Sequence, residues 1–298
     1  MIDEKKTDKK KDLKSLLIYL ALSFGFAWAW FLVFIKPGET WESIGSYKQS
    51  FVALGMLFPF IANMLTRKIT KEGYSLKGDN PLMFGINLKD RKIILYIMAI
   101  LLPWFYTELR IALELLFTPG LYDPGYYMEL EISKRELIAF PVAAIVSGTF
   151  FSFAAFGEEA GWRGYMMPKL MKLMGKGKAV IIGGIIWGLW HAPLTCIGHN
   201  FGTDYPGFPY VGILKMCILC TLMGMILTFV TVKSGSVWPA AIMHGVNNAG
   251  PGILAGFADY DRIGEGKMLF SGLFAMIISM LAVIIICVLL EKFKMIKN

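Results

Sequence analysis

The sequence alternates long apolar segments with short polar ones, and this alternation restricts the fold more than any other feature. A helix needs about 17 to 25 apolar residues to cross a bilayer core of about 30 Å. Candidate spans cover residues 16–35, 51–66, 93–117, 137–157, 179–198, 211–232, 236–252 and 268–290. Because 56% of the residues are hydrophobic and 17% are charged, the chain has more apolar surface than one soluble core can bury. We therefore predict an all-α polytopic membrane protein with about eight transmembrane helices.

Basic residues are divided unequally among the segments that join these spans. Most of the 30 Lys and Arg residues lie before residue 15, within 67–92, within 163–178, beside Lys233 or after residue 291. Lys and Arg gather on the cytoplasmic side of membrane proteins, so this pattern predicts that both termini are cytoplasmic. It also accounts for the net charge of +8 without nucleic acid as a partner. We expect the basic loop 67–92 to approach anionic lipid headgroups in the bilayer.

The chain is predicted to form one membrane domain without a soluble module. A lysine-rich cytoplasmic segment is expected at 1–15, a single transmembrane domain at 16–291 and a cytoplasmic tail at 292–298. The first apolar segment is interpreted as a retained span and not as a signal peptide. Trp28 and Trp30 stand where a signal-peptide cleavage site would need small residues.

Two adjacent carboxylates and an arginine interrupt the apolar sequence at FGEEAGWRGY, residues 156–165. Glu159 and Arg163 stand four residues apart, so on a helix they share a face and can form an ion pair. Glu158 is turned about 100° away from Glu159 and can point at something else. A charged side chain at the centre of a span costs about 2.5 to 3.5 kcal/mol on insertion scales, so three such groups indicate a function. The plainer alternative is that the fourth span ends at Phe156 and the charges meet the cytoplasm.

Two of the three histidines also fall inside predicted spans. His191 lies in WGLWHAP, and His244 lies in AIMHGVNNA, four residues before Asn248 and on the same helix face. At about 1.5 Å per residue, His244 is about 12 Å and His191 about 18 Å from the cytoplasmic side. Glu158 reaches a similar depth if the fourth helix continues through Met171. We therefore expect three helices to present these polar residues to one cavity, although a lone intramembrane histidine is as often a helix–helix hydrogen-bonding residue.

Small residues follow the two helices that carry these histidines. They are Gly183, Gly184 and Gly188 on the first helix, and Ala240, Ala241, Gly245 and Ala249 on the second. Small side chains let helices approach closely inside a membrane, which favours a compact arrangement around the cavity. The third histidine, His199, follows the fifth span and is expected to be solvated.

These residue types favour hydrolysis of an amide by an activated water molecule. A glutamate in a poorly hydrated site can take a proton from water, which makes Glu158 the candidate general base. His191 can orient the water, while His244 and Asn248 can donate hydrogen bonds to the tetrahedral oxyanion. No serine or cysteine stands in a nucleophile motif such as G-x-S-x-G. Glu158, His191 and His244 could also hold a divalent metal such as zinc, although no H-E-x-x-H helix is present.

Taken in order, the three motifs resemble those of the CPBP group of membrane proteins. This group contains the type II CAAX prenyl endopeptidases and the bacteriocin-processing or immunity-associated Abi proteins. The matching elements are E-E-x-x-x-R at 158–163, F/W-x-x-x-H at 187–191 and H-x-x-x-N at 244–248, and the resemblance covers about 137–251. Trp187 stands where the group often has phenylalanine. The resemblance implies an eight-helix α fold whose polar cavity opens to the cytosol.

The same resemblance implies a role for each matching residue. Glu158 would activate the catalytic water with His191, while His244 and Asn248 would form the oxyanion site. Glu159 and Arg163 would support this geometry. The group leaves the use of a metal open, and it includes members without demonstrated protease activity.

Three functions are compatible with these features. The leading hypothesis is an intramembrane endopeptidase of the plasma membrane that cleaves membrane-associated peptides, CAAX-like sequences or small, lipidated proteins. The second is a non-catalytic bacteriocin-immunity or membrane scaffold protein that kept the polar site. The third is a transporter whose buried Glu and His residues relay protons, which would require inverted repeats and paired broken helices.

Overall fold

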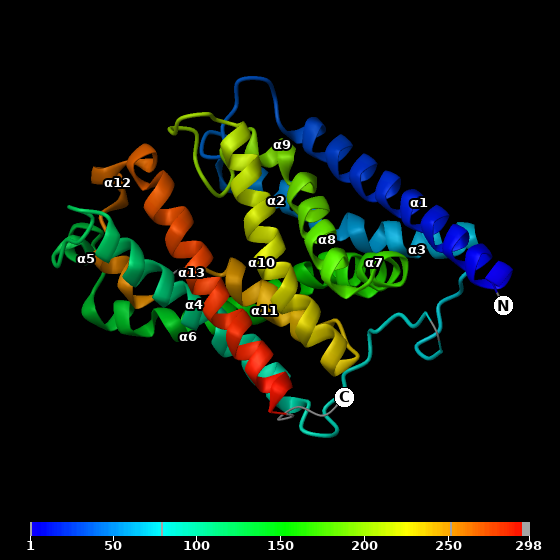
Figure 1. The fold of residues 1–298 in the computed structure, drawn as a ribbon. Coiled ribbons are helices and arrows are strands. Elements are labelled where there is room, and N and C mark those ends of the chain that lie inside the picture. Colours follow the sequence, from blue (N-terminus) through cyan, green and yellow to red (C-terminus); the bar gives the residue numbers. More distant parts are fainter. Residues whose placement is uncertain (1, 79, 251, 294–298) are drawn as a thin grey trace.

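The computed structural model describes residues 2–78, 80–250 and 252–293, and helices make up nearly all of its regular structure (Figure 1). The long helices are α1 (Ile2–Phe34), α4 (Ile93–Phe117), α6 (Lys134–Gly161), α10 (Tyr210–Ser234) and α13 (Glu265–Lys292). The shorter ones are α2 (Gly45–Ala53), η1 (Leu54–Leu57), α3 (Phe58–Thr70), α5 (Tyr126–Glu129), η2 (Trp162–Met166), α7 (Met167–Met174), α8 (Lys176–Trp190), α9 (Ala192–Thr195), α11 (Trp238–Asn248), η3 (Ile253–Phe257) and α12 (Tyr260–Ile263). Within the described residues, β-pairing is limited to an isolated bridge between Tyr122 and Ala258. The predicted all-α class is confirmed, while most of the predicted tail 292–298 lies outside the described residues.

Six helical stretches in the described part of the chain are long and apolar enough to cross a membrane. They are Asp8–Phe34, Gly45–Thr70, Ile93–Phe117, Lys134–Met174, Tyr210–Ser234 and Gly266–Lys292. A polytopic membrane fold is therefore confirmed. The predicted number of eight spans is not, because two of the predicted segments form helices that are too short.

These two segments, 179–198 and 236–252, contain α8 and α11. The helices have 15 and 11 residues, or about 22 Å and about 16 Å at 1.5 Å per residue, whereas the bilayer core is about 30 Å thick. Pro193 cannot continue the hydrogen-bond ladder of α8 because it lacks an N–H group. Gly250, with a φ of 115°, turns the chain away after α11. The apolar runs were long enough to span, but these breakers end the helices inside them.

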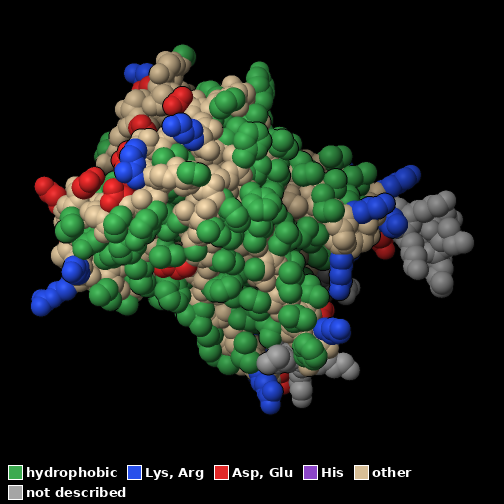
Figure 2. All heavy atoms as spheres, turned by 60° about the vertical axis from the view of Figure 1, so that its left-hand side comes forward, with side chains coloured by type: hydrophobic (Ala, Val, Ile, Leu, Met, Phe, Trp, Pro, Cys, Tyr) green, Lys and Arg blue, Asp and Glu red, His purple; other side chains and the backbone are tan. Residues whose placement is uncertain are grey.

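The outer surface of the bundle is apolar, as a lipid-facing surface must be. Figure 2 shows hydrophobic side chains over most of the middle of one face, with charged side chains gathered toward its ends. Large exposed hydrophobic residues occur along several long helices, including Leu32 on α1, Phe150 on α6 and Phe270 on α13. Such a continuous apolar surface would be unfavourable in water, so it supports burial in a bilayer.

The connections between helices fall on two sides of the bundle (Figure 1). One side holds the start of α1, the α3–α4 loop, the α7–α8 and α10–α11 turns and the end of α13. The opposite side holds the α1–α2, α4–α6, α9–α10 and α11–α13 connections. Lys and Arg are concentrated in the segments of the first side. The charge asymmetry of the sequence therefore corresponds to two opposite sides of the fold.

Glycines bring α8 against α10 and α6 against α11. A Cβ atom added at Gly188 would lie 2.5 Å from the Cα of Cys217, and one added at Gly148 would lie 2.5 Å from the Cα of Val246. These distances leave no room for a side chain, so the helix backbones are in direct contact. Close approach of helix backbones is thereby confirmed for the predicted positions Gly184, Gly188 and Gly245, whereas Gly183 faces the side chains of Met167 and Leu170.

The contact at Gly188 can be tested by adding one methyl group. Gly188→Ala should lower the Tm because the methyl group would push α10 away from α8, and overpacking of this kind costs about 1–3 kcal/mol. Gly177→Ala is the matched control in the first turn of the same helix, where an added Cβ meets nothing within 4 Å. The control should be neutral or stabilising because Ala favours helix more than Gly. Thermal unfolding in detergent measures both, and an equal Tm for the two variants would contradict the close contact.

Candidate functional site

Glu158, Glu159 and Arg163 lie where α6 runs into the π-helical turn η2. The helical path continues from Lys134 to Met174 without a break, which is the condition under which Glu158 was expected to reach the depth of the histidines. The three side chains are only 2%, 0% and 3% exposed. The plainer interpretation, in which the helix ends and the charges meet the cytoplasm, is therefore wrong. π-Helical turns occur frequently at functional sites because they locally widen the helix.

Glu159 connects α6 to α11 through one carboxylate oxygen. Its Oε1 accepts a hydrogen bond from Nη1 of Arg163 at 3.1 Å and another from Nδ1 of His244 at 2.9 Å. The predicted Glu159–Arg163 ion pair is thus confirmed. The Arg163 guanidinium also lies 4.0 Å from the ring centre of Trp187 on α8, a cation–π contact. We call Glu159, Arg163 and His244 the ion cluster, and through it three helices are held together.

Glu158 has different partners, in agreement with its predicted rotation on the helix. Its Oε2 accepts hydrogen bonds from the indole N–H of Trp187 at 2.7 Å and from that of Trp162 at 3.2 Å. Both donors are uncharged, so they orient the carboxylate without neutralising it. The two adjacent glutamates therefore differ in kind, because Glu159 is bound to charged groups while Glu158 is held by neutral ones.

His191 is the first residue after α8, whereas the sequence placed it well inside a span. Its Nδ1 lies 2.9 Å from the carbonyl oxygen of Trp187. A carbonyl oxygen only accepts hydrogen bonds, so Nδ1 carries the proton and the Nε2 of the neutral ring carries a lone pair. The half-buried ring stands nearly perpendicular to that of Trp190, with 4.9 Å between the ring centres. The short helix thus fixes which nitrogen of His191 can accept a hydrogen bond.

His244 also packs against Trp187. The two ring centres are 5.4 Å apart in an edge-to-face arrangement, and His244 is 5% exposed. Because Nδ1 donates to the Glu159 carboxylate, only Nε2 remains to contact a ligand. A neutral ring would offer an acceptor at Nε2, and only an imidazolium would offer a donor there.

Asn248 is the last residue of α11 and lies one helical turn after His244. It is exposed, and its Oδ1 accepts a hydrogen bond from the side chain of Asn247 at 3.0 Å. Asn247 also accepts a hydrogen bond from the Tyr106 hydroxyl on α4. This chain of contacts ties the end of α11 to α4 and leaves the Asn248 amide N–H groups available for a ligand.

His199 is not the solvated residue that the sequence suggested. It is half-buried, and its ring lies 4.2 Å from that of Trp41 between ring centres. Burial, with a smaller effect from nearby His191, lowers the pKa of His199 to about 3. The ring is therefore neutral at pH 7. The α9–α10 connection folds back on the α1–α2 loop, which a one-dimensional pattern does not reveal.

Motif reasoning included Trp187 but missed the role of two tryptophans as hydrogen-bond donors to Glu158. Trp162 stands four residues after Glu158, and Trp187 stands four residues before His191. This spacing places each indole on the same helix face as a proposed catalytic residue, so a signal was present. The sequence spacing alone could not show the partner of Trp187, because this indole donates to Glu158 on another helix and the contact depends on which helices pack together.

The residues proposed as metal ligands can be compared with the needs of a metal site. A hydrolytic zinc site uses three protein ligands within about 2.0–2.2 Å of one point. No group of three His, Cys, Asp or Glu side chains in the described part of the chain has such an arrangement. Glu158, His191 and His244 as they stand do not fit a three-ligand metal site.

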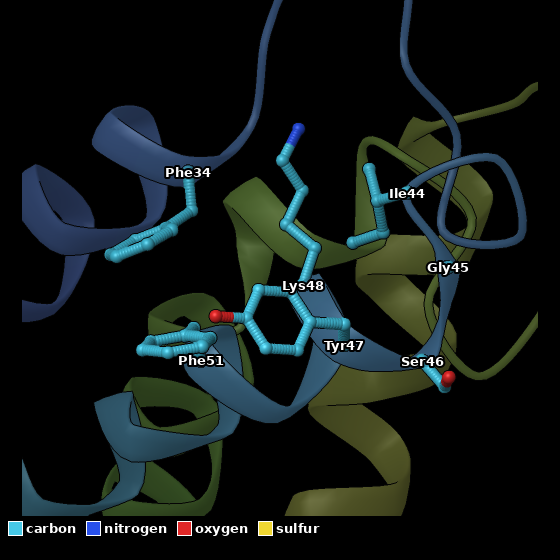
Figure 3. A pocket seen from close by; sticks show the side chains of 7 residues that line it. All are labelled: Phe34, Ile44, Gly45, Ser46, Tyr47, Lys48 and Phe51. Carbon is cyan, nitrogen blue, oxygen red and sulfur yellow. The ribbon is translucent and has the colours of Figure 1, made fainter.

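A surface pocket of about 630 Å³ lies away from these residues, at the end of α1 and the start of α2 (Figure 3). It is lined by Phe34, Ile44, Gly45, Ser46, Tyr47, Lys48 and Phe51. Lys48 is paired with Glu39 at 2.7 Å. The lining contains none of the residues of the three motifs, so this pocket is not the candidate site.

Comparison with known proteins supports the motif assignment. Residues 138–250 match the family model described as "Type II CAAX prenyl endopeptidase Rce1-like". A curated relative, "CAAX prenyl protease 2" of Methanococcus maripaludis, is 32% identical over 116 residues. The aligned segment is 39% of this chain and 43% of the relative, so the similarity spans less than half of either protein. The resemblance predicted from the sequence is confirmed, and the matching segment contains all three motifs.

The buried ion cluster gives a prediction about stability. Arg163→Met should lower the free energy of unfolding by about 3–5 kcal/mol because it leaves a buried carboxylate without its cation. Arg262→Met is the matched control, since Arg262 is 48% exposed in its ion pairs with Asp123 and Asp259. The control should lose at most about 1 kcal/mol. Denaturant unfolding in mixed micelles measures both variants, and similar losses would show that Glu159 does not depend on Arg163.

Proposed function

We propose that this chain is an intramembrane endopeptidase in which Glu158 activates water to hydrolyse a peptide bond. One observation carries the proposal: two buried carboxylates with different partners stand side by side, and residues from α8 and α11 surround them. Glu158 accepts only neutral donors, while Glu159 is engaged by Arg163 and His244. The match of residues 138–250 to a prenyl endopeptidase family supports the same conclusion.

Glu158 is the proposed general base. Indole hydrogen bonds from Trp162 and Trp187 fix its Oε2, so the direction of the carboxylate is set before substrate arrives. His191 presents the lone pair of Nε2, which can accept a hydrogen bond from a water molecule and orient its oxygen. The water loses one proton to Glu158 and attacks the peptide carbonyl carbon, and the carbonyl oxygen becomes an oxyanion.

His244 and Asn248 are the proposed donors to that oxyanion. Since Nδ1 of His244 is already bound to Glu159, the ring must be an imidazolium to donate from Nε2. The charges favour this state, because two carboxylates and one guanidinium leave one negative charge that an imidazolium balances. The Asn248 side chain supplies a second, neutral donor. Glu159 and Arg163 therefore act as positioning residues that keep His244 charged and in place.

The reaction ends when Glu158 returns its proton to the leaving amine. The C–N bond breaks, the new carboxyl group keeps the water oxygen, and the base is restored for the next cycle. No covalent intermediate is needed, in agreement with the lack of a serine or cysteine nucleophile motif in the sequence.

The proposed substrates are peptides or small proteins held at the membrane, including CAAX-like sequences with a lipidated cysteine. The curated relative is named for prenyl protease activity, and the basic side of the bundle would face the cytoplasm under the positive-inside rule. We infer a location in the plasma membrane with both termini cytoplasmic. Leader peptides and other membrane-bound peptides are also proposed substrates, because they too present a peptide bond at the membrane.

A transporter is less well supported. The structure has two short helices, α8 and α11, which a broken-helix transporter would also have. However, α10 crosses the bundle between them, so both begin on the same side and run in the same sense. Inverted repeats would make them run in opposite senses. The short helices are therefore better explained as the walls of a hydrolytic site.

Glu158→Gln tests the proposed function. In proteoliposomes with farnesylated CAAX peptides, the variant should lose about 10²- to 10⁴-fold in kcat, because the amide cannot accept the proton of water. Glu129→Gln, at an exposed site on α5, should keep wild-type activity. Retention of full cleavage by Glu158→Gln would reject the assignment.

Two further arms separate the alternatives. A divalent-metal chelator should leave cleavage unchanged under the water-only mechanism, whereas loss that zinc restores would support a metal held by Glu158, His191 and His244. In cells challenged with bacteriocin, equal protection by wild type, Glu158→Gln and His244→Ala would instead support the non-catalytic immunity function.

A further inference from the structure

Helix α1 contributes two buried hydroxyl groups that have no partner. Tyr19 and Ser23 are both 0% exposed, and neither hydroxyl has a hydrogen-bond partner in the described part of the structure. The two residues stand four apart, so they share one face of α1. Their hydroxyls are close enough to interact electrostatically, but the pair does not meet the distance and angle limits of a hydrogen bond.

This face of α1 lies against the proposed catalytic residues. α1 packs against α3, α7 and α8 (Figure 1). The Tyr19 ring stands edge-on to Trp162, 5.7 Å between centres, and Trp162 is the residue that donates to Glu158. Trp190, which precedes His191, donates its indole N–H to the carbonyl oxygen of Ser23 at 3.3 Å. The charges of Glu158, Glu159 and Arg163 also act at the Tyr19 hydroxyl. This segment of α1 therefore borders both Trp162, which donates to Glu158, and Trp190, which precedes His191.

Several other buried hydroxyls in the spans are satisfied within their own helices, whereas those of Thr66 and Thr228 are not. Ser152 donates to the carbonyl of Gly148, Thr231 to that of Leu227 and Ser234 to that of Val230, each four residues earlier. Ser23 could bind its own helix in the same way but does not. A buried hydroxyl without a partner costs free energy, so a hydroxyl kept in this state is expected to bind something else.

Further unpartnered polar atoms surround the same site. They are Oε2 of Glu159, Nε of Arg163 and Oγ1 of Thr228, all buried. Thr228 lies one turn after Gly224 on α10, and an added Cβ at Gly224 would lie 3.3 Å from Nη2 of Arg163. A buried water molecule needs two to four polar partners. The unpartnered donors and acceptors around Glu158 can supply them.

We propose that Tyr19 and Ser23 hold a water molecule against the Glu158 carboxylate and so act as positioning residues for hydrolysis. The inference rests on the proposed function, and it extends the site to a helix outside the segment 138–250 that matches the family model. Water bound here keeps Glu158 hydrated inside an apolar bundle and replaces the molecule consumed in each cycle.

Tyr19→Phe and Ser23→Ala test the proposal in proteoliposomes, because each removes one hydroxyl and little else. Each should lower kcat about 10- to 100-fold, as expected from misplaced reacting groups, and leave KM unchanged. The double variant should be no slower than the slower single variant, since both hydroxyls serve one water molecule. Ser23→Thr, which restores a hydroxyl, should recover most of the activity.

The Tm gives a readout that does not depend on catalysis. Loss of a hydroxyl that binds water should lower the Tm, whereas loss of an unpartnered hydroxyl should raise it. Tyr260→Phe is the control, because its hydroxyl donates a hydrogen bond to Glu114 at 2.7 Å and neither residue belongs to the three motifs. Tyr260→Phe should have a lower Tm than wild type and an unchanged kcat.

Wild-type kcat or a raised Tm in Tyr19→Phe would overturn the inference about α1 alone. Equal cleavage by wild type and Glu158→Gln would instead overturn the proposed function. In that case the Tm of Tyr19→Phe would still decide whether the hydroxyl pair binds water.

Discussion

The arrangement depends on one carboxylate oxygen, Oε1 of Glu159, which binds both Arg163 and His244 inside the bundle. Charges are costly to bury unless they are paired and hydrogen-bonded, so this contact requires α6 and α11 to touch. Glycines make that approach possible, because the helix backbones meet at Gly148 and Gly245. Because Glu159 binds the charged groups, Glu158 accepts hydrogen bonds only from the neutral indoles of Trp162 and Trp187 and is the proposed general base.

The two short helices explain how a polar site exists in an apolar bundle. Backbone that leaves a helix within a membrane needs polar partners or water. α8 ends just before His191 and α11 ends at Asn248, so each helix end places one proposed site residue beside the buried carboxylates. Tyr19 and Ser23 of α1 lie against the same region. The two helix ends that interrupt the regular structure are therefore also the places where proposed site residues lie.

Much of the fold could be predicted from hydropathy, because lipid requires long apolar helices whatever their packing. The ion pair of Glu159 and Arg163 and the separate direction of Glu158 also followed from helix geometry alone. The lengths of α8 and α11 could not be predicted in this way, because a hydropathy average over a segment does not register single helix-ending residues such as Pro193 and Gly250. The indole donors and the α1 hydroxyls depend on which helices become neighbours, and that is decided by packing across distant parts of the chain.

Glu159 and His244 should be coupled directly inside the bundle, and a double-mutant cycle measures this coupling. Unfolding free energies of wild type, Glu159→Gln, His244→Phe and the double variant give the interaction energy between the two side chains. We expect a coupling of about 1.5–3 kcal/mol, as for a hydrogen bond to a charged group. Additive losses, with coupling below about 0.5 kcal/mol, would contradict it.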